Sequence, residues 1–171
     1  MEQSYVLIKP REKRLKTCIS SIVFWFLGRA FQSVISFDKG AREEAQSISD
    51  GTVVLLKVNP KGPSMTLEKR QGKFLYIGAA KVRKPDIAIY FKNIDAAFLV
   101  LTGQLGIAQA YAEHRFTLKG DIFAAMSIVR ILYLVEAYLF PQFMSKKLLK
   151  EMPKKDTGKL KIYLATILGL K

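Results

Sequence analysis

Residue types that carry out chemistry are scarce in this chain. His114 is its only histidine and Cys18 its only cysteine, so neither has a second histidine or cysteine at a metal-ligand spacing. His114 lies in a polar Glu-His-Arg segment, where a structural or solvated role is favoured over catalysis. No nucleophile-elbow motif supports a Ser-His-Asp set. We therefore expect a protein that is not an enzyme and that holds no metal and no cofactor.

Two charged residues interrupt the apolar segment 122–140. Arg130 and Glu136 are six positions apart, so on a helix they do not share a face. Each can find a separate partner, or it can line a polar end of a cavity and meet a lipid head group. The sequence leaves both alternatives open.

The chain is strongly basic. Its net charge of +14 over 171 residues predicts attraction to polyanions, either nucleic acid or an anionic membrane. One basic cluster lies in 9–16 and another in 146–161, and each cation near an anionic bilayer contributes about 1 kcal/mol. Either cluster can hold a carrier transiently at a membrane, and a well-solvated basic surface is the alternative. The expected membrane contacts are Lys13, Arg14, Lys16, Phe24, Trp25, Lys146 and Lys147.

A nucleic-acid-binding function is the rival from another class. Gly103-Gln104-Leu105-Gly106 resembles the GXXG clamp of a KH domain, and the positive charge fits. That clamp grips phosphates and would want a basic or small residue where Leu105 stands, and the strands carry no RNP-like aromatic motif. We therefore expect no specific nucleic-acid partner.

Hydrophobic periodicity predicts the elements that position these residues. The pattern is a helix, three strands, a fourth strand, a helix pair, a fifth strand and a long helix, which is an α+β domain with one mixed sheet. The expected helices are 17–37, 93–103, 107–113, 122–140 and a last one at 163–170; the expected strands are 53–58, one around 65–67, 74–79, 87–91 and 115–119. Gly120-Asp121 is expected to end the last strand and to cap the helix that follows. The segment 38–51 is expected to be a polar connector. A sheet covered on one face by apolar helices can enclose a cavity between the two layers.

The first helix is unusually apolar. Its apolar stripe leaves out Phe24 and Trp25, which we expect to touch something other than the domain's own core or to pack on the terminal extensions. The stretches 18–37 and 122–140 approach the length of a membrane span, but Arg29 in the first and the two charges in the second favour buried protein helices. No clear small-x-small cleavage site supports a signal peptide.

Three segments resemble the sterol carrier protein 2 family when their order and spacing are taken together. They are Lys84–Phe91 followed by Asn93-Ile94-Asp95, then Leu101–Leu105, then Phe116–Asp121. The resemblance covers roughly 52–139, and it implies a five-stranded sheet with helices around an apolar tunnel that holds a fatty acyl chain, phospholipid or sterol. Both ends depart from the family, and the C-terminus is not a peroxisomal signal.

The resemblance implies a ligand site and a domain plan. The residues expected to line the tunnel are Phe74, Ile89, Phe91, Phe98, Leu101, Leu105, Phe116, Leu118 and Met126, with an ordinary filled core as the alternative. We expect a basic arm and amphipathic helix over 1–45, a sterol carrier-like domain over 46–141 and a basic extension over 142–171. The expected function is non-enzymatic lipid binding or transfer; a structural or regulatory module with a closed cavity is the alternative. A lone cysteine favours a cytoplasmic location, with peripheral attachment to the membrane.

Overall fold

The computed structural model describes residues 13–79, 84–140 and 156–169. Its helices are α1 (Arg14–Phe37), α2 (Lys39–Gln46), α3 (Ile94–Leu101), α4 (Ile107–Ala112), α5 (Ile122–Leu139) and α7 (Lys159–Leu168). Its strands are β1 (Val53–Val58), β2 (Ser64–Arg70), β3 (Lys73–Gly78), β4 (Ile87–Phe91) and β5 (Phe116–Gly120). The expected order of elements is therefore confirmed, with α2 as an addition.

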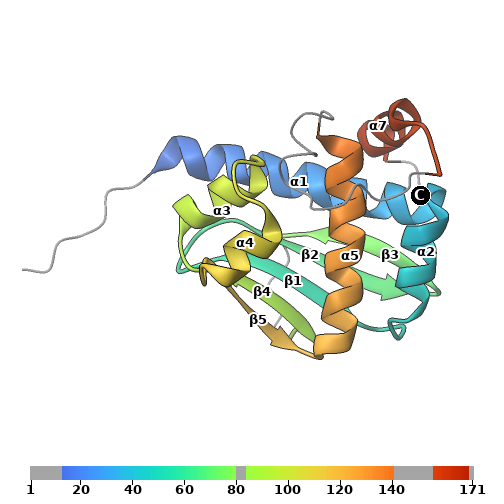
Figure 1. Ribbon diagram of the computed structural model, residues 1–171, viewed down its shortest axis with the longest axis horizontal. Coiled ribbons are helices and arrows are strands. Elements are labelled where there is room, and N and C mark those ends of the chain that lie inside the picture. The colour runs from blue at the N-terminus through green and yellow to red at the C-terminus, as the bar shows by residue number, and fades with distance from the viewer. Residues whose placement is uncertain (1–12, 80–83, 141–155, 170–171) are drawn as a thin grey trace, which may run out of the picture.

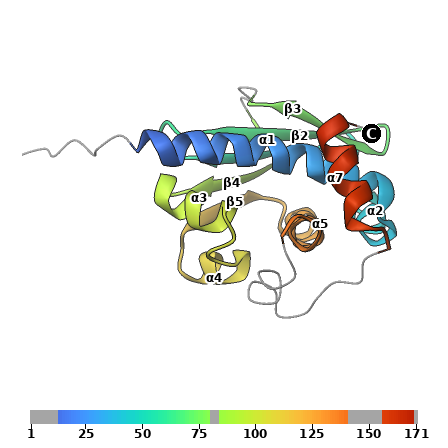
Figure 2. The same cartoon turned by 90° about the horizontal axis from the view of Figure 1, so that it is seen from above.

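The five strands form one mixed sheet in the order β3-β2-β1-β4-β5. β1 and β4 run parallel at its centre, and the other neighbouring pairs are antiparallel. In the described part of the chain, α3, α4 and α5 lie on one side of this sheet, and α1 packs on β2 and β3 (Figures 1 and 2). The predicted fold class, α+β with a five-stranded mixed sheet under helices, is confirmed.

The central strand pair places alternate side chains on the helix-covered face. In its parallel register Val54 lies beside Ile87 and Leu56 lies beside Ile89, and all four are buried in the core. Because side chains alternate between the two faces of a sheet, this register lines up an apolar row across β1 and β4. That row is the floor on which the helices sit.

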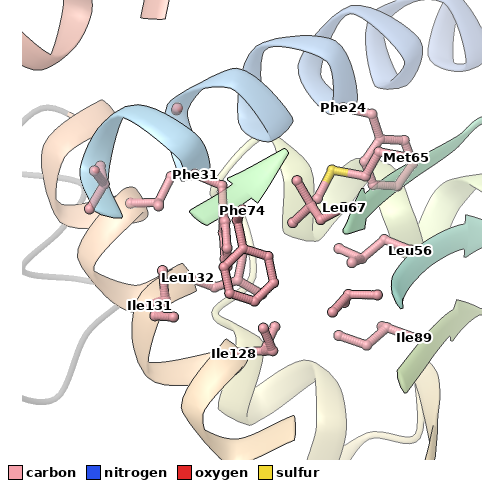
Figure 3. Packing of buried hydrophobic residues seen from close by; sticks show 14 of the residues in the cluster. Phe24, Phe31, Leu56, Met65, Leu67, Phe74, Ile89, Ile128, Ile131 and Leu132 are labelled. Atoms are coloured by element: carbon pink, nitrogen blue, oxygen red, sulfur yellow. The ribbon is translucent and has the colours of Figure 1, made fainter. Parts of the chain in front are cut away.

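Helix α1 contacts the sheet through a face that includes Phe24. Phe24 is buried, and in Figure 3 its ring lies beside Met65 of β2. About two turns further on, Phe31 meets Phe74 of β3 edge to face, with 5.4 Å between ring centres. The prediction that Phe24 is a membrane contact is therefore wrong. Because α1 is apolar around most of its circumference, the spacing of its apolar residues did not identify which side faces the sheet.

Gly28 allows α1 to approach β3 closely. A Cβ atom built at Gly28 would lie 2.4 Å from Cδ2 of the Tyr76 ring, which is too close for any real contact. We expect Gly28→Ala to destabilise the protein by about 1–3 kcal/mol, measured by urea unfolding, because the ring or the helix must shift. Gly40→Ala in α2 is the matched control, since its nearest neighbour would be Asp38 Oδ1 at 3.4 Å. Equal stability of Gly28→Ala and wild type would contradict this packing.

Helix α2 lies where a polar connector was expected. Only Ala41 and Ala45 are buried along it, so it lacks the wide apolar stripe by which a helix is recognised from sequence. Its stability comes from its start: the Asp38 carboxylate accepts a hydrogen bond from the Ala41 amide at 3.0 Å. The same carboxylate accepts a 2.6 Å hydrogen bond from the buried Tyr138 hydroxyl of α5, which joins the two helices.

The last two described helices begin and end at recognisable residues. Asp121 caps α5 by accepting from the Phe123 amide at 2.9 Å, as the Gly-Asp segment predicts. α7 begins at Lys159, four residues before the expected Tyr163, and Gly169 closes it in a left-handed conformation. α7 packs against α1.

Helices α1 and α5 are long and apolar enough to cross a membrane when judged by length and composition alone. Of their most apolar windows, 50% and 56% respectively are buried inside the domain. In this structure both helices contribute side chains to the core. This agrees with the expectation that charged residues within the two stretches favour buried protein helices over membrane spans.

Candidate ligand pocket

An apolar pocket of about 280 Å³ lies between the sheet and its helices. Protein interiors contain few voids larger than a water molecule, and ligand pockets begin at about 300 Å³, so this hollow is close to ligand size. Its lining consists of Ile22, Val23, Phe26, Leu27, Leu56, Ile89, Phe91, Val100, Leu101, Ile107, Phe116, Val129, Leu132, Glu136, Leu139 and Phe140.

Three strands supply the floor of the pocket. Leu56 of β1 is paired with Ile89 of β4, and two residues along β4, Phe91 is paired with Phe116 of β5; all four line the pocket. The Phe91 and Phe116 rings are 5.6 Å apart at an interplanar angle of 62°. Such edge-on aromatic packing holds both rings in place, so the floor is formed in advance of any ligand.

Four helices supply the walls, and they come from distant parts of the chain. α1 contributes Val23 and Phe26, α3 and α4 contribute Leu101 and Ile107, and α5 contributes Leu132. Ile22 is 60% exposed although it lines the pocket, so it marks the mouth, where α1 meets solvent. An apolar side chain at the mouth is compatible with the entry of a hydrophobic ligand.

Glu136 is the exception among the described lining residues, which are otherwise all apolar. Its side chain is buried, with 8% of the residue exposed, and its Oε2 has no hydrogen-bond partner in the described structure. Burial raises the pKa of Glu136 to about 8, because the surroundings cannot solvate the carboxylate. At neutral pH this carboxyl is therefore mostly protonated and can both donate and accept a hydrogen bond.

Arg130 does not share this environment. Its guanidinium Nη1 donates to Glu44 Oε2 of α2 at 3.0 Å on the protein surface. Of the two alternatives left open by the sequence, Arg130 has found a separate partner, whereas Glu136 lines the cavity. The six-residue spacing does place the two charges on different faces of α5.

Four of the expected tunnel residues line the pocket: Ile89, Phe91, Leu101 and Phe116. They lie on β4, α3 and β5, which are the segments that carry the family resemblance. Each was expected from an alternating strand or a helix face, and the structure brings all four around one hollow.

The other five expected residues do not line it. Met126 is 46% exposed on the outer side of α5, so the expectation that it faces a tunnel is wrong. Phe74 is buried between α1 and β3, where its ring packs on Phe31 and not on the hollow. Leu105 and Leu118 are half-buried and pack against the core from its margin.

Phe98 also lies outside the pocket lining, near the start of α1. The Lys16 ammonium lies 5.4 Å from the centre of its ring, and the Lys16 Nζ also donates to Asp95 Oδ1 at 2.6 Å. The helix face that reaches the pocket from α3 carries Val100 and Leu101 instead. A charge placed at Phe98 therefore does not test ligand binding.

Sequence reasoning missed the contributions of α1 and of most of α5. Ile22, Val23, Phe26 and Leu27 belong to the apolar stripe that was recognised, but their role as a pocket wall was not. The signal was available in the width of the apolar surface of α1, which exceeds what one contact with the sheet can bury. Which residues of that surface line the pocket depends on how α1 docks on the sheet.

The predicted membrane contacts have different environments. Lys13 and Lys16 both donate to Asp95 of α3, and these hydrogen bonds lower the pKa of that carboxyl. Trp25 is 44% exposed, with the Arg29 guanidinium 4.9 Å from its ring centre. Arg14 is exposed at the start of α1, and Lys146 and Lys147 lie outside the described residues.

The residues that were weighed for catalysis show no assembled site in the described chain. His114 is exposed in the turn before β5, with a backbone φ of 53°. Cys18 is exposed on α1. Within the described ranges, no group of three or more His, Cys, Asp or Glu residues is close enough together to hold a metal ion.

Comparisons with known proteins return sterol carrier protein 2 structures, the family that the three sequence segments resemble. UbiJ-SCP2, a ubiquinone synthesis protein, is 19% identical with a TM-score of 0.40, and the match covers 74% of this chain and 100% of that one. Sterol carrier protein 2 from Yarrowia lipolytica in its apo form is 21% identical with a TM-score of 0.46, covering 67% of this chain and 89% of that one. Palmitated SCP2L2 from Aedes aegypti is 13% identical with a TM-score of 0.38, covering 59% and 92%.

No family model and no curated protein matches the chain. At these identities and TM-scores the likeness transfers no ligand and no partner. The class of ligand must therefore be inferred from the size and lining of the pocket.

Proposed function

We propose that this protein binds an apolar or amphiphilic lipid in the pocket and carries it without changing it chemically. The observation that supports this is the hollow of about 280 Å³, lined by apolar side chains and reached past the exposed Ile22. A fatty acid, a phospholipid chain or a sterol-like lipid each presents the apolar surface that such a lining can bury. The proposal includes a cytoplasmic location with peripheral attachment to membranes.

The expected affinity follows from the apolar surface buried. Each buried methylene contributes about 0.8 kcal/mol, so ten of them offer on the order of 8 kcal/mol. Association and ordering remove several kcal/mol of this, and a rigid pocket floor keeps that cost down. The net result is binding in roughly the millimolar to micromolar range, which suits a carrier because the ligand must also leave.

Mass spectrometry of the purified protein tests the proposal. Organic extraction of the full chain should release an enriched lipid, and a neutral apolar dye such as N-phenyl-1-naphthylamine should bind with weak salt dependence. The absence of an enriched lipid together with no dye binding would refute lipid carriage. If the ligand that co-purifies is lost steeply as the salt concentration rises, the site instead binds a polyanion.

The surface around the mouth of the pocket supports attachment to an anionic membrane. Exposed apolar side chains on α1 and the neighbouring α7 include Ile22, Trp25, Leu164 and Leu168. Cations accompany them: the Arg29 guanidinium lies over Trp25, and the Lys161 ammonium lies 4.5 Å from the ring centre of Phe37. Apolar side chains among cations are the combination that binds the interface of anionic bilayers.

We expect Trp25→Glu to weaken binding to phosphatidylglycerol-containing vesicles at least about tenfold, since it removes an interfacial aromatic and adds repulsion. Vesicle co-sedimentation measures the effect. Phe123→Glu is the matched control because Phe123 is 84% exposed and belongs to the first turn of α5. In Figure 1, α7 lies near the other end of that helix. Equal losses for both variants would show that net charge, and not this surface, determines attachment.

A further inference from the structure

One buried polar atom in the pocket has no hydrogen-bond partner in the described chain. Glu136 is buried at 8% exposure, and its Oε2 makes no hydrogen bond within the described ranges. Nearly all buried polar atoms in native proteins have a partner, so an unpartnered carboxyl oxygen in a cavity requires an explanation. A ligand atom that completes the hydrogen bond is one such explanation.

Other polar side chains on α5 and α7 have partners of their own. Arg130 pairs with Glu44, Lys159 donates to the Phe140 carbonyl at 2.7 Å, and Tyr163 donates to the Leu139 carbonyl. Tyr133 lies one turn before Glu136 on α5, and burial and then the Glu136 charge raise the pKa of its hydroxyl. None of these contacts satisfies Glu136 Oε2.

We propose that Glu136 anchors the polar end of the ligand and selects a lipid that ends in a neutral hydrogen-bond donor, a hydroxyl group, over one that ends in a carboxylate. This inference rests on the lipid-carrier function proposed above. The remaining described lining is apolar, so the hydroxyl has one polar side chain available, and the acyl or ring portion takes the apolar space.

The selectivity follows from the charge that each head group brings into the pocket. A hydroxyl and a protonated carboxyl form a neutral pair, in which each group can donate to and accept from the other. A carboxylate ligand would place a net negative charge on the pair in an apolar hollow, where no described lining residue is cationic. A site built around one hydrogen bond to a hydroxyl discriminates strongly against ligands that cannot form it.

Three ligands with the same chain length test the inference: dodecan-1-ol, sodium dodecanoate and methyl dodecanoate. Each is titrated against protein-bound N-phenyl-1-naphthylamine at pH 7, with the full chain. The wild-type protein should bind the alcohol at least about tenfold more tightly than the carboxylate, and also more tightly than the ester, whose carbonyl can accept from the Glu136 carboxyl but which has no group to donate to it. Glu136→Leu should reduce the alcohol-to-ester ratio to about one, since the apolar space remains while the anchor is gone.

Glu136→Gln provides the second variant in case Glu136→Leu does not fold. Its amide is nearly the same size and keeps an acceptor oxygen, so the alcohol should stay ahead of the ester, with its advantage reduced. A wild-type preference for dodecanoate, or an alcohol-to-ester ratio that Glu136→Leu leaves unchanged, would overturn the role of Glu136 while leaving lipid carriage intact. If none of the three ligands displaces the dye, lipid carriage itself fails, and this inference fails with it.

Discussion

Replacing Val129 with tryptophan is expected to abolish lipid binding while leaving the protein folded. Val129 of α5 belongs to the pocket lining, so a larger side chain there can extend into the hollow of about 280 Å³. If the indole displaces four ligand methylenes, the ligand loses about 3 kcal/mol, or roughly 100-fold in affinity. Dye displacement with dodecan-1-ol measures the loss, and a thermal melt follows folding.

Stability should not fall in this variant, because the indole fills space that is otherwise empty. Cavities cost stability in proportion to their volume, so a side chain that occupies one without strain leaves Tm unchanged or raises it. Met126→Trp is the matched control: it adds the same indole to the same helix, on the exposed outer side. Wild-type affinity in Val129→Trp, with Tm preserved, would show that lipids bind somewhere other than this pocket.

The stability of the protein is expected to depend on pH through Glu136. Burial raises the pKa of this carboxyl from its ordinary value of 4.5 to about 8 in the folded protein. Between these values the folded state keeps a proton that the unfolded chain releases. Unfolding therefore releases a proton, and rising pH favours the unfolded state. The contribution is complete below about pH 4.5 and is lost as the pH rises through 8.

The size of this effect is about 1.4 kcal/mol per pH unit while the two states differ by one proton. From about pH 5 to about pH 8, the free energy of unfolding of the wild type should fall by about 3 to 4 kcal/mol relative to Glu136→Gln. Urea unfolding of both proteins at each pH measures the difference, in which the other groups cancel. Tyr133 and Tyr138 titrate above this range, since burial raises the pKa of both, that of Tyr138 to about 12.

Glu44→Gln is the control for a carboxylate outside the pocket. Its side chain lies at the surface and pairs with Arg130, so its removal should leave the pH profile close to that of the wild type. Parallel profiles for the wild type and Glu136→Gln across this pH range would mean that the Glu136 carboxyl is solvated in the folded protein. The same result would weaken its assignment as the anchor of a ligand.

Local patterns in the sequence determined the architecture. The alternation of apolar residues over 87–91 predicted β4, and the Gly-Asp pair before α5 predicted its cap, because strand faces and helix starts depend on a few neighbouring residues. α2 escaped prediction because two buried alanines and a capping aspartate leave almost no hydrophobic signal. The scarcity of histidine and cysteine likewise set the expectation of a non-catalytic protein.

Only the tertiary structure decided which residues surround the hollow. Phe24 and Phe26 are two positions apart on α1, yet the first packs on the sheet and the second lines the pocket. Periodicity placed Phe26 on the apolar stripe and Phe24 off it, but it does not say which apolar face of the helix meets the sheet; the docking of the helix against β2 and β3 decides that. Glu136 shows the same dependence, since its place in a lining shared with Leu101 and Leu56 follows from contacts between segments far apart in the chain. Composition determines that apolar surface must be buried, but how the layers dock determines where space for a ligand is left.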